Sequence, residues 1–136
     1  MRAWNEQGDR YRLLFEFQSP LLSVRLQGQV GPEENLAVTT EYWRKIARAV
    51  TEAGAAQLLV LDEMPGEVMT DAELERFFDS LAGLGLENVQ IAYVEARVDQ
   101  IPRIEYAQVL AQERGYRVRT FGTEAEAMLW LRYGQV

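Results

Sequence analysis

The sequence predicts a single α/β domain built on one mixed, mostly parallel sheet, with elements in the order ββαβαβαβα. Two observations predict this class. Apolar and polar residues alternate over residues 11–27, and strand-like and helix-like patterns then alternate over residues 39–131. Strands that alternate with helices are joined by right-handed crossovers and lie parallel to one another. The first two strands make the sheet mixed.

The first two strands are predicted as an antiparallel hairpin that turns at Ser19-Pro20. Every second residue on each side of the turn is apolar: Leu13, Phe15, Phe17, Leu22, Val24 and Leu26. Residues 1–10 lack such a pattern, so we expect a flexible N-terminal tail there and a domain over residues 11–136. Residues 28–35 are expected to form a loop.

The next elements are a helix between the hairpin and two central strands. Apolar residues at steps of three and four predict a helix over residues 39–53, which Gly54 ends. Residues 58–62 begin with four apolar residues in a row, which is typical of a strand covered on both faces. Residues 89–94 repeat this pattern, and we expect the two strands to be parallel neighbours.

Three further helices are marked by their first residues. Thr70 and Glu73 form a capping box at the start of one helix. Pro102 suits the first turn of the next helix, which runs to about residue 114. A second capping box at residues 123–126 opens the last helix, after a short strand whose alternating arginines indicate a sheet edge.

The composition excludes several classes of function. The chain has no histidine, no cysteine and a single lysine, Lys45. It therefore lacks the usual general base at neutral pH, the thiolate nucleophile and the softer zinc ligands. We expect no enzymatic activity, no catalytic residues, no cofactor and no metal. Carboxylate acid–base chemistry, with Mg²⁺ if any metal, is the alternative that this composition leaves open.

The charge and hydropathy of the chain bear on its partners. The net charge is −7, and an acidic protein is repelled by DNA, RNA and anionic lipid. No apolar run approaches the roughly 20 residues that cross a bilayer. We therefore expect a cytoplasmic protein without nucleic-acid binding or membrane insertion.

The order of elements and four segments carry a family resemblance. The segments are the strand at 58–62 with its turn into the Thr70 helix, the strand at 88–94, the strand Arg117-Val118-Arg119-Thr120-Phe121, and the helix at 124–131. Over about residues 11–133 the chain resembles the STAS-like domains, which include bacterial anti-sigma-factor antagonists and uncharacterised bacterial relatives. It looks most like the uncharacterised branch.

The resemblance implies a non-catalytic regulatory module that binds a protein partner. In the better-understood branch, a serine at the start of the helix after the third strand is a switch, turned off by phosphorylation. Thr70 occupies the matching place and is the candidate phosphosite, although Asp71 follows it where the family has small residues. A helix cap alone also explains a threonine at this position. Other members of the superfamily resemble lipid carriers, so a small apolar or lipid-like ligand is an alternative.

Acidic residues gather where the first central strand ends and the Thr70 helix begins. In open α/β sheets, ligands bind beyond the carboxyl ends of the strands, where this cluster is expected to lie. It suits a protein partner with a basic surface, or it is simply a solvated rim. Asp62 and Glu63 are adjacent and should point to opposite faces, which disfavours a metal site. The candidate partner-binding residues, here called the acidic rim, are Glu63, Glu67, Thr70, Asp71 and Glu75.

The cationic residues form one concentration near the C-terminus: Arg103, Arg114, Arg117, Arg119 and Arg132. These arginines fit an acidic partner or the acidic rim of a second copy, so a homodimer is one alternative. Solvated charges that protect an edge strand are the other.

The aromatic residues divide into two predicted groups. Those on apolar stripes should be core residues: Trp43, Phe77, Phe78 and Tyr93. Some of those beside the stripes should remain partly exposed: Tyr42, Tyr106, Trp130 and Tyr133.

Overall fold

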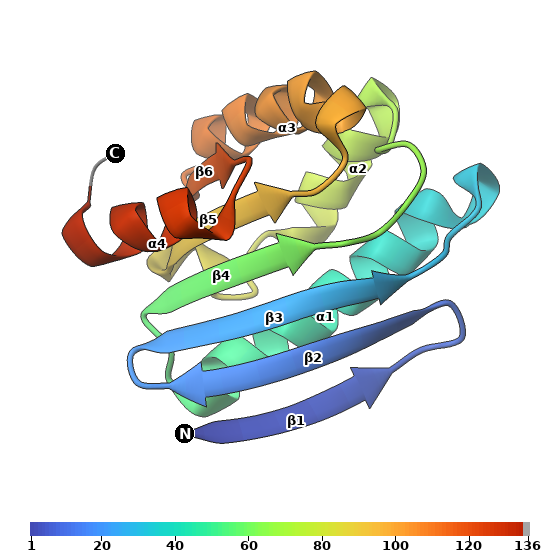
Figure 1. The fold of residues 1–136 in the computed structure, drawn as a ribbon. Helices are drawn as coiled ribbons and strands as arrows, with labels where there is room; N and C mark the ends of the chain where they lie inside the picture. Colours follow the sequence, from blue (N-terminus) through green and yellow to red (C-terminus); the bar gives the residue numbers. More distant parts are fainter. Residues whose placement is uncertain (135–136) are drawn as a thin grey trace.

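A computed structural model describes residues 1–134, which form one six-stranded sheet and four α-helices (Figure 1). The strands are β1 (Arg2–Gln7), β2 (Tyr11–Gln18), β3 (Leu21–Gly28), β4 (Gln57–Asp62), β5 (Gln90–Glu95) and β6 (Arg117–Phe121). The helices are α1 (Asn35–Ala53), α2 (Asp71–Leu81), α3 (Ile101–Glu113) and α4 (Glu124–Tyr133). Short 3₁₀ turns are η1 (Pro32–Glu34), η2 (Leu86–Asn88) and η3 (Val98–Gln100).

The strands lie in the sheet in the same order as in the chain. The pairs β1–β2 and β2–β3 are antiparallel, and the pairs β3–β4, β4–β5 and β5–β6 are parallel. The sheet is therefore mixed, antiparallel over its first three strands and parallel over the rest. The predicted hairpin and the predicted parallel neighbours, β4 and β5, are confirmed, and β6 is an edge strand as its arginines indicated.

The predicted element order is wrong at its start, because residues 2–7 form a strand where we expected a flexible tail. β1 pairs with β2 from Arg2 opposite Phe17 to Gln7 opposite Arg12. The Trp4 ring stacks on Phe15, with 5.0 Å between ring centroids. As an edge strand whose one large apolar side chain is Trp4, β1 has none of the apolar alternation that reveals a strand buried on one face. The observed order is βββαβαβαβα.

The helices begin and end close to the predicted places, with one difference. α1 begins at Asn35 rather than residue 39, so the expected loop is shorter. It ends at Gly54, whose positive φ of 68° suits glycine. The capping box at Thr70 is confirmed: the Thr70 hydroxyl accepts from the Glu73 N–H, and the Glu73 side chain accepts from the Thr70 N–H. Over residues 1–134 no helix is long and apolar enough to cross a membrane.

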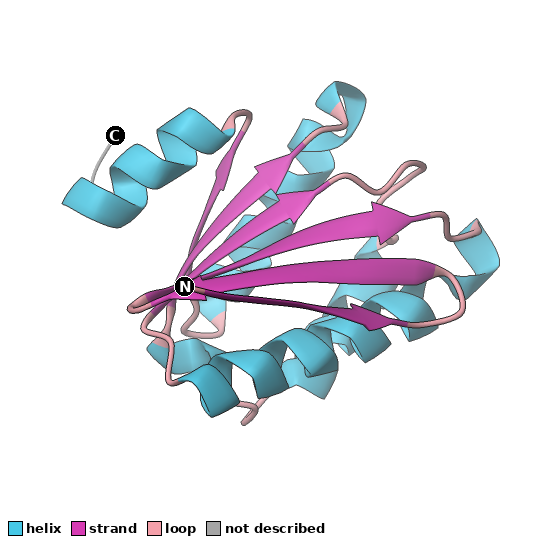
Figure 2. Cartoon of the chain, turned by 60° about the horizontal axis from the view of Figure 1, so that its bottom comes forward, coloured by secondary structure: helices cyan, strands magenta, loops and turns pink. Residues whose placement is uncertain are grey.

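Helices lie on both faces of the sheet (Figure 2), and each face has its own apolar core. α1, α2 and α3 pack on one face with the inward residues of β2 and β3, while α4 packs on the opposite face over β4, β5 and β6. β4 serves both cores, since Leu58 and Val60 belong to the larger and Leu59 and Leu61 to the smaller. This double burial explains its unbroken apolar run.

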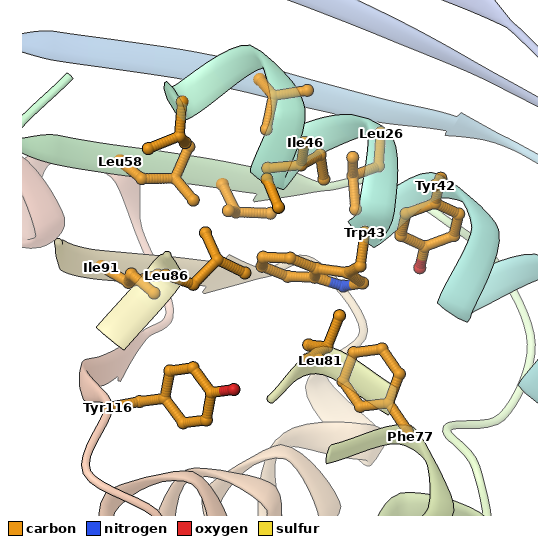
Figure 3. Packing of buried hydrophobic residues seen from close by; sticks show 14 of the residues in the cluster. Leu26, Tyr42, Trp43, Ile46, Leu58, Phe77, Leu81, Leu86, Ile91 and Tyr116 are labelled. Atoms are coloured by element: carbon orange, nitrogen blue, oxygen red, sulfur yellow. The ribbon is translucent and has the colours of Figure 1, made fainter. Parts of the chain in front are cut away.

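Three of the four aromatic residues predicted as core, Trp43, Phe77 and Phe78, are buried in the larger core, and Tyr93 packs against it half-buried. Trp43 extends from α1 toward Phe77 and Leu81 of α2 (Figure 3), and its ring also stacks on Tyr93. Among the four aromatic residues beside the stripes, Tyr42 and Trp130 are not exposed. Tyr42 is buried in the larger core, and Trp130 is buried against Phe121 in the smaller one. The spacing of apolar residues along the helix did not reveal the burial of Trp130, because α4 packs on the second face of the sheet. Tyr106 and Tyr133 are exposed, as expected.

Candidate functional site

Two carboxylates lie buried side by side where β4 and β5 end. Asp62 is the last residue of β4 and stands opposite Glu95, the last residue of β5, because the parallel register aligns the two strands residue by residue. Their exposed fractions are 2% and 1%. Burial of two carboxylates is costly unless they are paired and hydrogen-bonded.

Arg97 supplies that pairing, two residues after β5. Its Nε lies 2.6 Å from Glu95 Oε1, and its Nη2 lies 2.9 Å from Glu95 Oε2 and 3.0 Å from Asp62 Oδ2. The Tyr93 hydroxyl also donates to Asp62 Oδ2, and the Met64 N–H donates to Asp62 Oδ1 over 2.8 Å. We call Asp62, Tyr93, Glu95 and Arg97 the buried charge cluster. With one guanidinium for two carboxyl groups, it carries an excess negative charge when both are ionised.

The excess negative charge contributes to a raised pKa of Asp62. Burial of its carboxyl, and next the negative charge of Glu95, raise the pKa of Asp62 to about 6, although Arg97 and Tyr93 act in the opposite direction. Burial and the Asp62 charge raise the pKa of Tyr93 and Tyr42 above the ordinary value for a phenol. Both hydroxyls therefore stay neutral at physiological pH, and Asp62 is the group that titrates near it.

A cavity of about 120 Å³ lies next to the cluster, between the sheet and helices α1, α2 and α3. Asp62, Tyr93 and Arg97 line its polar end. It reaches the surface at Pro65 and Glu67, which are exposed. Aromatic side chains supply much of the remaining wall: Tyr42, Trp43, Phe77, Phe78 and Tyr116. A mainly apolar pocket with a few convergent polar groups is the usual form of a small-molecule site.

The loop between β4 and α2 covers the mouth of this cavity and is fastened by side chains from other elements. Arg97 Nη1 donates to the Gly66 carbonyl over 3.1 Å. Asn35 Nδ2 donates to the Glu67 carbonyl over 2.8 Å, and Gln100 Oε1 accepts from the Val68 N–H over 2.8 Å. The buried charge cluster thus helps to hold the segment that leads into α2.

The structure brings together three of the five acidic-rim residues predicted as partner-binding. Glu67, Thr70 and Asp71 line one shallow surface hollow with Arg103 of α3, and all three are exposed. Asp71 Oδ1 pairs with Arg103 Nη1 at 2.6 Å, so a cation of the same chain already lies against this part of the rim.

The other two rim residues lie apart. Glu63 belongs to the outer face of the sheet, where Arg25 pairs with it and Gln27 Nε2 donates to it over 2.9 Å. These two hydrogen bonds hold the pKa of Glu63 below its usual range. Glu75 lies further along α2, 2.6 Å from Arg114 Nη2. Asp62 and Glu63 point to opposite faces of the sheet, as their adjacency predicted. Glu63 therefore lies on the outer face, away from the buried Asp62.

The arginines predicted as one cationic group also divide. Arg103 and Arg114 pair with carboxylates of α2 in the same chain. Arg119 lies over the rings of Phe121 and Trp130, at 5.7 Å and 5.9 Å from the ring centroids. Arg117 and Arg132 are exposed. The five therefore do not form a single patch.

An exposed apolar stripe runs along α3 beside the rim. Val98 is 78% exposed, Val109 50% and Tyr106 39%. Pro102, Tyr106 and Val109 are exposed at steps of four and three along α3, so they share one side of the helix, and Val98 lies in η3 just before it. Contiguous exposed apolar groups often mark a protein-binding surface. We call Val98, Pro102, Tyr106 and Val109 the α3 stripe.

The chemistry of the site is that of a buried carboxyl group whose pKa lies near neutrality. Among residues 1–134, no three carboxylate side chains are gathered in a way that could hold a metal ion. In the buried charge cluster, Arg97 holds both oxygens of Glu95, while Asp62 Oδ1 accepts one hydrogen bond from the described residues. Asp62 Oδ1 can therefore accept one more hydrogen bond, and of the two carboxyl groups Asp62 is the one that lines the cavity.

Glu95 and Arg97 escaped the sequence analysis, although a signal for them existed. An acidic residue ends each of two neighbouring central strands, and parallel strands end at the same edge of the sheet. An arginine two residues after the second of these acids could then have been recognised as their partner. Polar residues at strand ends usually belong to solvated turns, and that common explanation obscured the signal.

Comparisons with known proteins give a structural likeness over most of the chain and a partial sequence likeness. No family model matches the chain. A crystal structure of an anti-sigma factor antagonist from Mycobacterium paratuberculosis superposes with a TM-score of 0.56 and 16% identity, over 93% of this chain and 97% of that one.

The sequence relatives are much longer than this chain. Two proteins called ribose import ATP-binding protein RbsA, from Lactococcus lactis subsp. cremoris (strain SK11) and subsp. lactis (strain IL1403), are each 30% identical over 95 residues. The match covers 70% of this chain and 18% of each relative. The structural match covers nearly the whole of both chains. The chain therefore has the fold of an anti-sigma factor antagonist, which confirms the STAS-like fold predicted from the sequence.

Proposed function

We propose that this chain is a non-catalytic, cytoplasmic regulatory module that binds a protein partner through the surface formed by α2 and α3. The observation that carries the proposal is the α3 stripe, which lies exposed beside the carboxylates at the start of α2. The shared fold with an anti-sigma factor antagonist supports a regulatory role of this kind.

The chemistry of this surface defines the partner. Glu67, Asp71 and Glu75 are exposed around the N-terminal half of α2, and the chain as a whole has a net charge of −7. An apolar centre flanked by carboxylates complements a partner surface with apolar side chains inside a basic border. Because Arg103 and Arg114 partly neutralise the rim, the apolar contact contributes most of the affinity and the charges mainly steer the approach.

The role proposed for Thr70 is that of a helix cap. Its hydroxyl already accepts the Glu73 N–H over 3.3 Å, and a phosphate there would lie among Glu67, Asp71 and Glu73. That electrostatic environment disfavours an added dianion. A phosphoswitch at Thr70 would therefore act by repelling the partner or by opening the cap.

The ATP-binding activity named for the sequence relatives has no counterpart in this proposal. A P-loop needs a glycine followed by lysine and then serine or threonine, and the single lysine, Lys45, follows Arg44.

A binder of a small apolar or lipid-like ligand is the second candidate function, and the cavity between the sheet and the helices favours it. Carboxylate-based catalysis is the third, and the raised pKa of Asp62 favours it.

Partner capture from a lysate of the native cell tests the docking surface. We expect Tyr106→Ala with Val109→Ala to reduce recovery of the partner at least about tenfold, because the apolar centre of an interface supplies most of its energy. Glu67→Gln with Asp71→Asn should reduce recovery about two- to fivefold and flatten its dependence on salt. Glu16→Gln, on the outer face of the sheet, is the matched control for a lost carboxylate.

The result that contradicts the proposal is equally definite. Unchanged recovery with the Tyr106/Val109 double variant, at wild-type folding, would place the partner elsewhere. The thermal midpoint of each variant shows whether the fold is retained, since the substituted side chains are exposed.

A further inference from the structure

The cavity beside the buried charge cluster has an unusual combination of charge and wall chemistry. Among its lining residues, the side chains that carry charge at neutral pH are Asp62, Glu67 and Arg97. Glu95 lies directly behind Arg97 and accepts two hydrogen bonds from its guanidinium. The negative charges therefore outnumber the positive ones at the polar end of the cavity.

An anion does not suit this cavity. Arg97 is its positive residue, and four of its five guanidinium N–H groups donate to Glu95, Asp62 and the Gly66 carbonyl. An anionic group would have to use the remaining Nη1 N–H or displace one of these acceptors, and in either case it would lie close to Asp62. Placing a further negative charge in this buried site is costly.

A cation meets the opposite conditions. Asp62 Oδ1 accepts one hydrogen bond, from the Met64 N–H, and a carboxylate oxygen can accept two. Trp43 and Tyr93 lie stacked at 6.4 Å between centroids, and Tyr42, Phe77 and Phe78 line the same space. Aromatic faces attract cations, and do so more strongly where water is excluded.

The volume limits the size of the occupant. An apolar protein cavity of about 150 Å³ holds one benzene molecule. The cavity here is about 120 Å³, so its occupant has a compact apolar body of about four to six heavy atoms. A larger ligand would extend past Pro65 and Glu67 to the surface.

From these observations we propose that the cavity binds a small organic cation, an amine whose ammonium group faces Asp62 and whose short apolar body lies among Trp43, Phe77 and Tyr93. This site is separate from the α2–α3 docking surface, and its test uses no protein partner.

The titration of Asp62 gives the proposal a pH dependence. Asp62 faces Tyr93 and Glu95 of β5, Arg97 and, from α1, Tyr42. Arg97 stays charged and both phenols stay neutral, so protonation of Asp62, whose pKa is about 6, removes the excess negative charge. Cation binding should therefore be tighter at pH 8 than at pH 5.

Titration with three probes of matched length tests the proposal: n-butylamine hydrochloride, butan-1-ol and sodium butanoate. At pH 8 and constant ionic strength, we expect the amine to bind at least about tenfold more tightly than the alcohol, and butanoate not to bind. The amine should shift the indole N–H resonance of Trp43. Trp4 on β1 and Trp130 on the opposite face of the sheet are internal controls whose resonances should not move.

Two variants test separately the contribution of the Asp62 carboxylate and that of the cavity volume. Asp62→Asn should weaken amine binding at least about tenfold and abolish its change between pH 5 and pH 8, whereas Asp9→Asn, in the β1–β2 turn, should not change it. Ala107→Leu adds three carbon atoms to the cavity wall and leaves the charged cluster intact, so it should weaken the amine and the alcohol alike.

Equal affinities for amine and alcohol would overturn the proposal and leave an ordinary apolar cavity. Amine binding that is insensitive to Asp62→Asn, or that leaves the Trp43 resonance unmoved, would overturn it too. A failure of partner capture by the α2–α3 surface would not affect any of these readouts.

Discussion

The chain carries two groups of carboxylates near the same end of its sheet, and they differ in almost every physical respect. Asp62 and Glu95 are buried, share one guanidinium and point into the larger core. Asp71 and Glu75 are exposed on α2 and each pairs with an arginine of the α3 region. Where a carboxylate lies relative to the sheet therefore determines its burial and its charge partners more than its closeness to other acidic residues in the sequence.

The difference has an energetic consequence. An exposed ion pair contributes at most about 1 kcal/mol to stability, because water screens it. A buried pair is different: the charges cannot return to water when one partner is removed, so the remaining charge is left uncompensated. Substitutions of the two kinds of arginine should separate widely.

The largest expected effect is that of Arg97→Ala. It leaves Asp62 and Glu95 buried without a cation, and we expect a loss of about 3–5 kcal/mol of unfolding free energy, measured from urea midpoints at pH 7. Arg103→Ala, which removes the partner of Asp71, should cost about 1 kcal/mol or less. Similar losses for the two variants would show that the buried charge cluster is hydrated and behaves like the rim.

The second effect is a dependence of stability on pH that comes from Asp62. The folded-state pKa of about 6 lies above the ordinary value of 3.8, so the folded chain retains this proton longer than the unfolded chain. The contribution of Asp62 is most favourable below pH 4 and declines as pH rises to about 6, by up to about 3 kcal/mol.

The measurement is the difference in unfolding free energy between wild type and Asp62→Asn, followed from pH 4 to pH 7. The wild type should lose stability relative to the variant over this interval, because the variant lacks the titrating group. A constant difference would show that Asp62 titrates at its ordinary pKa, and the contrast with the exposed carboxylates would then disappear.

The smallest effect concerns the rim itself. Thr70→Ala removes the acceptor of the Glu73 N–H and should cost about 1 kcal/mol, while Thr70→Ser keeps that acceptor and should be nearly neutral. Chemical denaturation of both variants checks this prediction. An equal loss for serine and alanine would mean that the threonine methyl group, rather than the cap, stabilises the start of α2.

The sequence was sufficient for the parts of the fold where one physical rule dominates. The apolar run of β4 predicted burial on both faces, and Leu58 and Leu59 indeed face different cores. The capping box at Thr70 located the start of α2. β1 was missed because an edge strand that buries part of one side chain, Trp4, needs no alternation.

The candidate site was less predictable than the fold, because its parts come from segments that only the register of the sheet brings together. Glu63 and Glu67 were grouped because they are close in the sequence. Successive residues of a strand point to opposite faces of the sheet, so Glu63 lies on the face opposite to Asp62 and apart from Glu67. Glu95 and Arg97 were overlooked because nothing in their local sequence distinguishes a buried acid from a solvated one. The stripe on α3 was recognised only in part: Tyr106 was expected to be exposed, but nothing in the sequence set Val98 and Val109 apart from core residues.

The side chains that fasten the β4–α2 loop have a consequence for hydrogen exchange. The Met64 amide donates to Asp62 and the Val68 amide donates to Gln100, while Arg97 holds the Gly66 carbonyl between them. These two amides exchange with solvent only when the loop opens locally. The free energy of that opening depends on the strength of the hydrogen bonds that Asp62 and Glu95 accept from Arg97. Their protection factors therefore report on the interior of the protein from a segment at its surface.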